Sequence, residues 1–94
     1  MKTCKIETIT IKTDERLVNL ARQLKGWTFD INGCLFTIIN NKLFTLFVNS
    51  DTDELDITVE EMDKNGQFEI CLEWWTLLNE NDFRTIYTFV NQYK

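Results

Sequence analysis

The sequence predicts an α+β domain: a curved antiparallel sheet of about six strands with two amphipathic helices, in the order β-α-β-β-β-β-β-α. Two Asn-Gly pairs, at 32–33 and 65–66, each separate two apolar runs. This pattern is typical of β-hairpins, because both central residues of a type I′ turn need positive φ. Apolar residues recur at helical spacing in two other segments, 14–25 and 81–93. Helices packed on an antiparallel sheet define the α+β class.

The whole chain, residues 1–94, is expected to form one domain. With 44% hydrophobic and 13% aromatic residues, 94 residues can fill a single core without disulfide bonds. No apolar run approaches the length of a membrane span, and the first residues lack the apolar region of a signal peptide. We therefore expect a cytoplasmic protein.

The first two elements are a strand and a helix. Residues 4–12 alternate well enough for a strand if a bulge lies near Thr8. Thr13 is then the expected helix N-cap, and Gly26 supplies the left-handed stop. The helix between them carries an apolar stripe along one face: Leu17, Leu20, Ala21 and Leu24.

The stretch from Trp27 to Val48 predicts three successive strands at the centre of the sheet. If the turn at Asn32-Gly33 has two residues, Phe29 faces Phe36. One face then holds an apolar set that we expect to form the core: Trp27, Phe29, Ile31, Cys34, Phe36 and Ile38.

The next turn leaves two alternatives for the third of these strands. A two-residue Asn40-Asn41 loop places Leu43, Thr45 and Phe47 on the expected core face. A three-residue loop that includes Lys42 places a different set there: Phe44, Leu46 and Val48. We favour the longer loop, because it makes the core face wholly apolar and because Asn tolerates positive φ.

A second hairpin and a final helix complete the fold. The hairpin runs from Leu55 to Met62 and from Gln67 to about Trp75, with an apolar inner face: Ile57, Val59, Phe68, Ile70, Leu72 and Trp74. Asn81 is the expected N-cap of the last helix, whose stripe is Phe83, Ile86, Tyr87, Val90 and Tyr93. The pattern predicts these residues as fully buried: Phe29, Phe36, Ile38, Val59, Leu72 and Ile86.

Composition disfavours catalysis and metal binding. The chain has no His, which removes the commonest general base and metal ligand. Its three cysteines, Cys4, Cys34 and Cys71, form no C-x-x-C pair. The acidic run at 51–56 lacks the Gly and the final Glu of an EF-hand loop. We therefore expect no enzyme, no cofactor and no metal.

Charge is divided unequally along the chain, whose net charge is −5. Residues 1–50 hold seven Lys or Arg against four Asp or Glu, whereas residues 51–82 hold one Lys against eleven Asp or Glu. The basic residues of the first helix are too sparse for a nucleic-acid site. This distribution favours a basic protein surface as the partner of the second half.

The outer face of the second hairpin is the predicted partner site. It groups four carboxylates with one Trp: Asp56, Glu60, Glu69, Glu73 and Trp75. Like charges on one face repel, so this grouping favours a basic partner that is steered electrostatically and anchored on Trp75. By analogy of composition alone, compact acidic proteins of this type include phage-borne anti-defence and immunity proteins that inhibit nucleic-acid-handling proteins. The alternative is an ordinary solvated face.

Two further functions stay open from the sequence. The second face of the central strands carries an apolar set that predicts either the homodimer interface of a structural or assembly protein or a surface under a helix: Leu35, Ile39, Leu43 and Phe47. A curved sheet also offers a small-molecule pocket near Trp27 and Trp74. Neither function requires catalytic residues.

Overall fold

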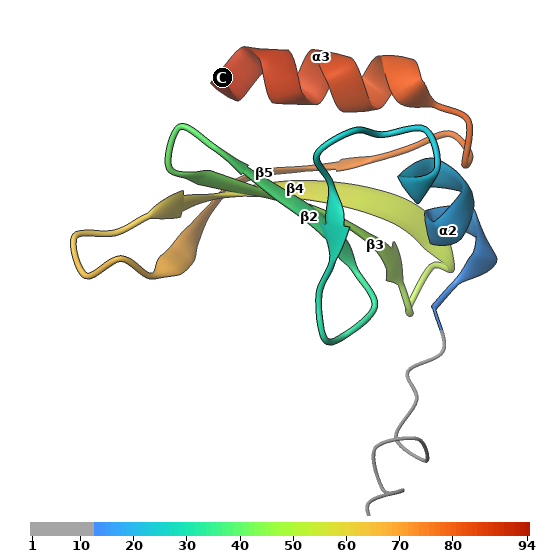
Figure 1. Cartoon of the computed structure of the whole chain (residues 1–94), viewed down its shortest axis with the longest axis horizontal. Coiled ribbons are helices and arrows are strands. Elements are labelled where there is room, and N and C mark those ends of the chain that lie inside the picture. The colour runs from blue at the N-terminus through green and yellow to red at the C-terminus, as the bar shows by residue number, and fades with distance from the viewer. Residues whose placement is uncertain (1–12) are drawn as a thin grey trace, which may run out of the picture.

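The computed structural model describes residues 13–94, which form five strands and two helices (Figure 1). The strands are β1 (Thr28–Phe29), β2 (Leu35–Ile39), β3 (Lys42–Asn49), β4 (Glu54–Met62) and β5 (Phe68–Thr76). The helices are α2 (Glu15–Ala21) and α3 (Phe83–Tyr93). The predicted α+β class is confirmed, but the described part of the chain has five strands instead of about six. The strand predicted at residues 4–12 lies outside the described residues.

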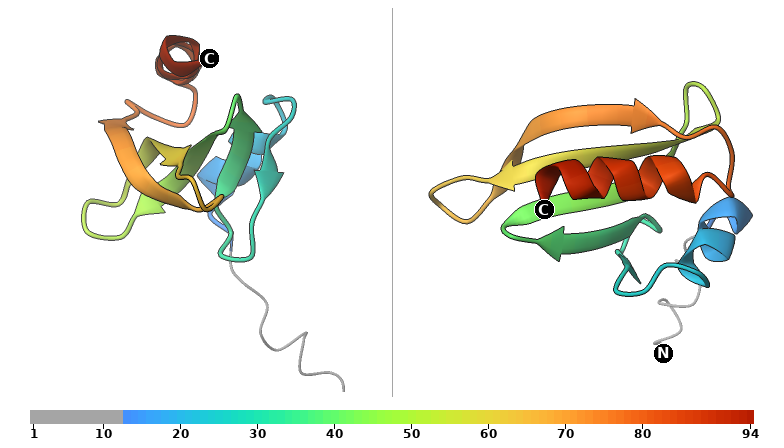
Figure 2. Two further views of the ribbon diagram at one scale, coloured as in Figure 1. Left: turned by 90° about the vertical axis from the view of Figure 1, so that its left-hand side faces the viewer. Right: turned by 90° about the horizontal axis from the view of Figure 1, so that it is seen from above.

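The sheet is an antiparallel meander in the order β1-β2-β3-β4-β5, so each strand pairs with its neighbours in sequence. Helix α3 lies along one face of the curved sheet, and α2 lies at one end of it (Figures 1 and 2). Side chains of both helices and of one sheet face join a single apolar core. The two helices therefore cover the same face of the sheet.

Each helix begins after an aspartate. The side chain of Asp14 accepts a hydrogen bond from the backbone N–H of Arg16 at 2.9 Å, so Asp14 and not the predicted Thr13 caps α2. The side chain of Asp82, and not that of the predicted Asn81, accepts from the backbone N–H of Thr85 at 3.1 Å at the start of α3. A carboxylate suits both positions, because the helix dipole favours negative charge there.

Both Asn-Gly pairs lie in three-residue loops, one residue longer than predicted. In the first loop the backbone N–H of Asp30 donates to the carbonyl of Cys34 at 2.8 Å. The Asp30 carboxylate accepts from the N–H groups of Asn32 and Cys34 at 2.8 and 2.9 Å. Gly33 takes φ 82° at the end of the loop. A three-residue loop that ends in a left-handed Gly is the next most common hairpin connection after the two-residue turns.

The second Asn-Gly loop repeats this arrangement. The Asp63 carboxylate accepts from the N–H groups of Asn65 and Gln67 at 2.8 and 2.9 Å, and Gly66 takes φ 82°. Both loops therefore share the pattern Asp-x-Asn-Gly. In each, the Asp side chain holds the extra residue of the loop in place.

The turn at Asn40-Asn41 is the two-residue turn, so the preference for a longer loop was wrong. Ile39 pairs with Lys42, and the two Asn residues take φ 51° and 63°, as a type I′ turn requires. Phe44 and Leu46 are nevertheless in the core as expected. The first loop is one residue longer than predicted and this turn is one residue shorter, so the two errors cancel on β3.

Only the first loop precedes β2, so its extra residue is not compensated there. The face of β2 that was predicted to lie away from the core therefore points into it. Leu35 is fully buried, whereas Ile38 is 51% exposed and Phe36 is half-buried. Phe29 and Leu72 are also exposed, so four of the predicted core residues were wrong and only Val59 and Ile86 are confirmed. A slip of one residue exchanges the two faces of a strand, since its side chains alternate.

Two bulges in β5 change its alternation. The pairing shifts between Val59 and Glu60 and again between Glu61 and Met62. Glu73 consequently opposes Val59, and Trp75 opposes Ile57, on the side of the helices. A bulge adds one residue to one strand and so exchanges the faces beyond it.

Candidate partner-binding surface

The face of the sheet that carries neither α2 nor α3 is the candidate functional site. Three rows of cross-strand neighbours define this helix-free face: Ile38, Leu43, Glu60 and Cys71; then Phe36, Thr45, Thr58 and Trp74; then Phe47, Asp56 and Thr76. Alternation places these side chains opposite the buried core residues of the same strands. Six of these eleven side chains are apolar, although neither of the two described helices packs on this side of the sheet.

An apolar groove of about 260 Å³ crosses one end of this face. It is lined by Asp30, Phe36, Ile38, Leu43, Thr45 and Phe68. Its apolar lining comes from Ile38 and Leu43 of one row, from Phe36 of the next row and from Phe68 of β5. Apolar surface of this kind is typical of interaction sites when it is contiguous.

Trp74 and Phe47 form an aromatic pair at the other end of the face. Their ring centroids lie 5.6 Å apart with an interplanar angle of 64°, and Trp74 is 54% exposed. The indole Nε1–H of Trp74 donates to Oδ2 of Asp56 at 2.8 Å, and the side-chain amide of Asn49 donates to the same oxygen at 3.0 Å. The aromatic pair is therefore held in place by a buried carboxylate.

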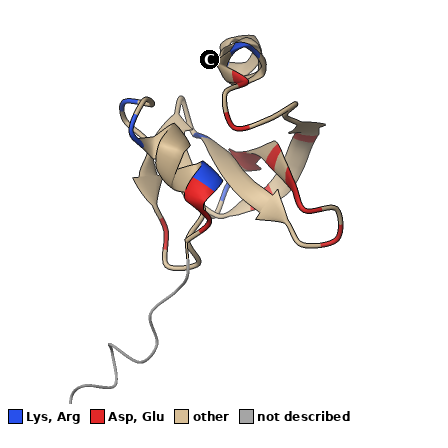
Figure 3. Ribbon diagram, turned by 90° about the vertical axis from the view of Figure 1, so that its right-hand side faces the viewer, with Lys and Arg blue, Asp and Glu red and all other residues tan. Residues whose placement is uncertain are grey.

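The helix-free face is acidic as well as apolar. Asp56 and Glu60 belong to its three rows, and within residues 13–94 those rows contain no Lys or Arg. In Figure 3 acidic residues recur along the strands and their loops, whereas Lys and Arg are sparse there. Large apolar groups beside unpaired carboxylates suit a partner that is both apolar and basic.

The five residues of the predicted partner site do not lie together. Asp56 and Glu60 are on the helix-free face, but Asp56 is buried. Trp75 packs against Phe89 with ring centroids 4.9 Å apart, on the opposite side. The bulges in β5 cause this separation, because they turn Glu73 and Trp75 toward α3.

Glu73 is bonded within the fold instead of facing a partner. Its carboxylate accepts hydrogen bonds from the Tyr93 hydroxyl and, at 2.6 Å, from the indole Nε1–H of Trp75. Tyr93 first, and Trp75 second, lower the pKa of Glu73 below its usual value. Glu69, the fifth predicted residue, is exposed beside a bulge.

Trp74 was predicted to lie in the core but is exposed on the helix-free face. Trp74 and Trp75 are adjacent and alternate in side, so one of them had to face outward. The Asp that precedes each Asn-Gly pair was the signal for the longer loop. The bulges themselves left no such signal in the sequence.

The predicted second interface is also divided between the two faces. Leu35 is fully buried in the core and Ile39 packs against that core, so both lie under the helices. Leu43 and Phe47 lie on the helix-free face. Likewise, Trp27 packs against the core while Trp74 is on the other side, so the two do not share a pocket.

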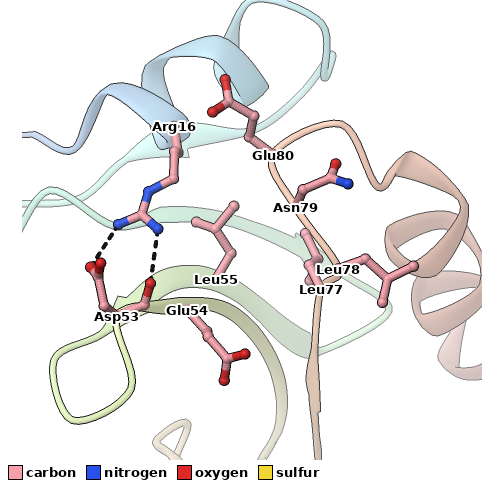
Figure 4. Close-up of a pocket in the computed structure, with 8 residues that line it drawn as sticks. All are labelled: Arg16, Asp53, Glu54, Leu55, Leu77, Leu78, Asn79 and Glu80. Atoms are coloured by element: carbon pink, nitrogen blue, oxygen red, sulfur yellow. Dashed lines mark hydrogen bonds and ion pairs between the residues drawn. The ribbon is translucent and has the colours of Figure 1, made fainter.

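A second depression, of about 210 Å³, lies where α2 meets the loops before β4 and after β5 (Figure 4). Leu55 and Leu77 line it beneath Arg16. Arg16 donates to Oδ1 and to the backbone carbonyl of Asp53, at 3.0 and 2.9 Å, and its Nε donates to Asp14 at 2.9 Å. These partners, Asp14 first, raise the pKa of Arg16. The guanidinium thus links the start of α2 to the loop before β4 within the fold.

No family model matches the chain, and neither the curated proteins nor the solved structures contain a match to it. Within residues 13–94, no three His, Cys, Asp or Glu side chains are grouped so that they could hold a metal ion. None of the described helices is long and apolar enough to cross a membrane.

Proposed function

We propose that this chain is a non-catalytic protein-binding module that docks its helix-free face on a basic and partly apolar surface of another protein. The observation that carries the proposal is the exposure of large apolar side chains on a sheet face whose three rows hold Asp56 and Glu60 and no Lys or Arg. Ile38 and Trp74 are 51% and 54% exposed there. Aromatic anchors surrounded by polar groups recur at binding hot spots.

Charge favours a different protein over a second copy as the partner. A two-fold contact through this face would bring Asp56 and Glu60 of both copies together, with no Lys or Arg in the three rows to offset them. Like charges brought together in an interface are costly, whereas a basic partner is attracted from a distance. Inhibition of a basic nucleic-acid-handling protein, of the anti-defence or immunity kind, is one form that this function could take.

The test compares three variants of the full chain as bait in lysate of the cells that produce it. Trp74→Ala and Ile38→Asp change the helix-free face. Tyr87→Ala is the matched control, because Tyr87 is 52% exposed but lies on α3. We expect one captured protein to be lost with the first two variants and kept with the control. Equal capture by all three would overturn the proposal.

Self-association is tested separately by light scattering over a concentration series. We expect a monomer for the wild-type chain. A dimer that Ile38→Asp dissociates would instead assign the helix-free face to a second copy of this chain.

A further inference from the structure

Asp56 has an unusual environment on the helix-free face. Only 2% of the residue is exposed, and its Oδ2 accepts both described hydrogen bonds, from Trp74 and Asn49. Its Oδ1 is buried and has no hydrogen-bond partner among the residues that the structure describes. A buried carboxylate oxygen without a partner is unfavourable, because nothing replaces the water that it lost.

Two partly exposed aromatic side chains neighbour Asp56. Trp74 donates its indole N–H to the carboxylate and contacts the ring of Phe47, the cross-strand neighbour of Asp56. More than half of Trp74 is exposed, so its ring offers a free face to an incoming group. Indole rings attract cations through their negative faces.

We infer that Asp56, Trp74 and Phe47 form a receptor for one arginine side chain of the partner. The guanidinium would stack on the Trp74 ring and donate to Oδ1 of Asp56, the oxygen that has no partner in the fold. This inference rests on the proposed function, and it names the chemical group that the face recognises. Since Oδ1 is buried in this structure, the side chains around Asp56 must shift for the guanidinium to reach it.

Arginine fits this receptor better than lysine. The guanidinium is planar, stacks on aromatic rings and is weakly hydrated, and it presents several N–H groups in a fixed plane. It can therefore contact the indole face and the carboxylate together. An ammonium group is strongly hydrated and does not stack, so it loses more on entering a covered site.

The receptor can be tested on the full chain without knowing the partner. The probe is a blocked tripeptide, acetyl-Gly-Arg-Gly-amide, added to protein that is ¹⁵N-labelled in its Trp side chains. The Trp74 indole resonance, assigned with Trp74→Phe, reports binding, and the Trp27 and Trp75 resonances serve as internal references. A peptide with Lys in place of Arg keeps the charge but not the planar group that stacks. A peptide with citrulline keeps the planar group but not the charge.

We expect a saturable shift of the Trp74 resonance with the Arg peptide, at least fivefold weaker binding of the Lys peptide, and none of the citrulline peptide. Asp56→Asn should abolish binding of the Arg peptide. Glu61→Gln is the matched control and should retain it, because Glu61 is on the same strand but outside the three rows.

Equal binding of the Arg and citrulline peptides, or a shift that survives in Asp56→Asn, would overturn the receptor. So would the lack of a saturable shift. That failure is distinct from failure of the proposed function, because capture of the partner could still depend on Ile38 and Trp74. In that case the face would bind its partner through apolar contacts alone.

Discussion

Phe44 on β3 and Phe89 on α3 meet edge to face, with ring centroids 6.2 Å apart and an interplanar angle of 79°. Both residues are fully buried, and α3 thereby fixes which face of the sheet is the core. Phe36, on the neighbouring strand, points to the helix-free face and is only half-buried. Phe36 of β2 and Phe44 of β3 therefore lie on opposite faces of the sheet, and only Phe44 belongs to the core.

This difference predicts unequal losses of stability. Phe44→Ala should reduce the free energy of unfolding by about 3–5 kcal/mol, because it leaves a cavity in the core. Phe36→Ala should reduce it by roughly 1–2 kcal/mol, since part of the ring is already in water. Urea denaturation of both variants measures this. A larger loss for Phe36→Ala would mean that the faces of the sheet are assigned the wrong way round.

Two substitutions in the hairpin loops should change stability in opposite directions, because one removes a glycine and the other adds one. Gly66→Ala should destabilise the fold by about 1 kcal/mol, because φ is 82° there. No atom beyond the two neighbouring residues lies within 4 Å of the added Cβ, so the loss comes from the backbone conformation. Asn41→Gly, at φ 63°, should be neutral or slightly stabilising in the type I′ turn. Thermal melts of the two variants test the assignment of turn types, which fails if both shift the midpoint in the same direction.

The contact between Tyr93 and Glu73 predicts a dependence of stability on pH. The pKa of Glu73 is lowered in the folded state, first by the Tyr93 hydroxyl. The contribution of Glu73 to the free energy of unfolding is therefore fully present above the usual pKa of 4.5. It is lost as the pH falls through the lower pKa that Glu73 has in the folded state. The pKa of Tyr93 is raised by the same contact, so stability should also fall as the pH rises above 10.

Tyr93→Phe separates this contact from other acid effects. The variant should move the pKa of Glu73 back toward its usual value, and it should flatten the acid side of the stability curve. A carboxyl NMR titration of Glu73 in the two proteins measures the shift directly. An unchanged Glu73 pKa in Tyr93→Phe would show that the Tyr93 hydroxyl does not lower it.

The sequence was sufficient for the class of fold and for the existence of both helices, although α2 ends at Ala21 and not at the predicted Gly26 stop. The stripes that contain Leu17, Leu20 and Ile86 are long enough to identify a buried helix face, and Asn-Gly marks a hairpin whatever the loop length. The register was predicted wrongly, because it depends on one residue in each loop. The carboxylates of Asp30 and Asp63 favour three-residue loops by accepting two N–H groups each.

The candidate site was predicted only in part for the same reason. Asp56 and Glu60 are on the expected outer face, since β4 has no bulge of its own between them. Glu73 and Trp75 are not, because β5 contains the extra residues and turns them toward α3. A bulge depends on how two strands pair, so the pattern of a single strand does not reveal it. Trp74 consequently replaces Trp75 as the exposed aromatic residue.

We propose that the helix-free face, and not the acidity of the chain as a whole, attracts the partner. Glu60 and Glu61 are adjacent on β4 and point to opposite sides of the sheet. Glu60→Lys and Glu61→Lys therefore change the net charge equally but on different faces. The decisive measurement is the association rate of the captured partner with each variant over a range of salt concentrations. We predict that Glu60→Lys slows association and weakens its salt dependence, while Glu61→Lys changes both far less. Equal effects of the two variants would contradict the account.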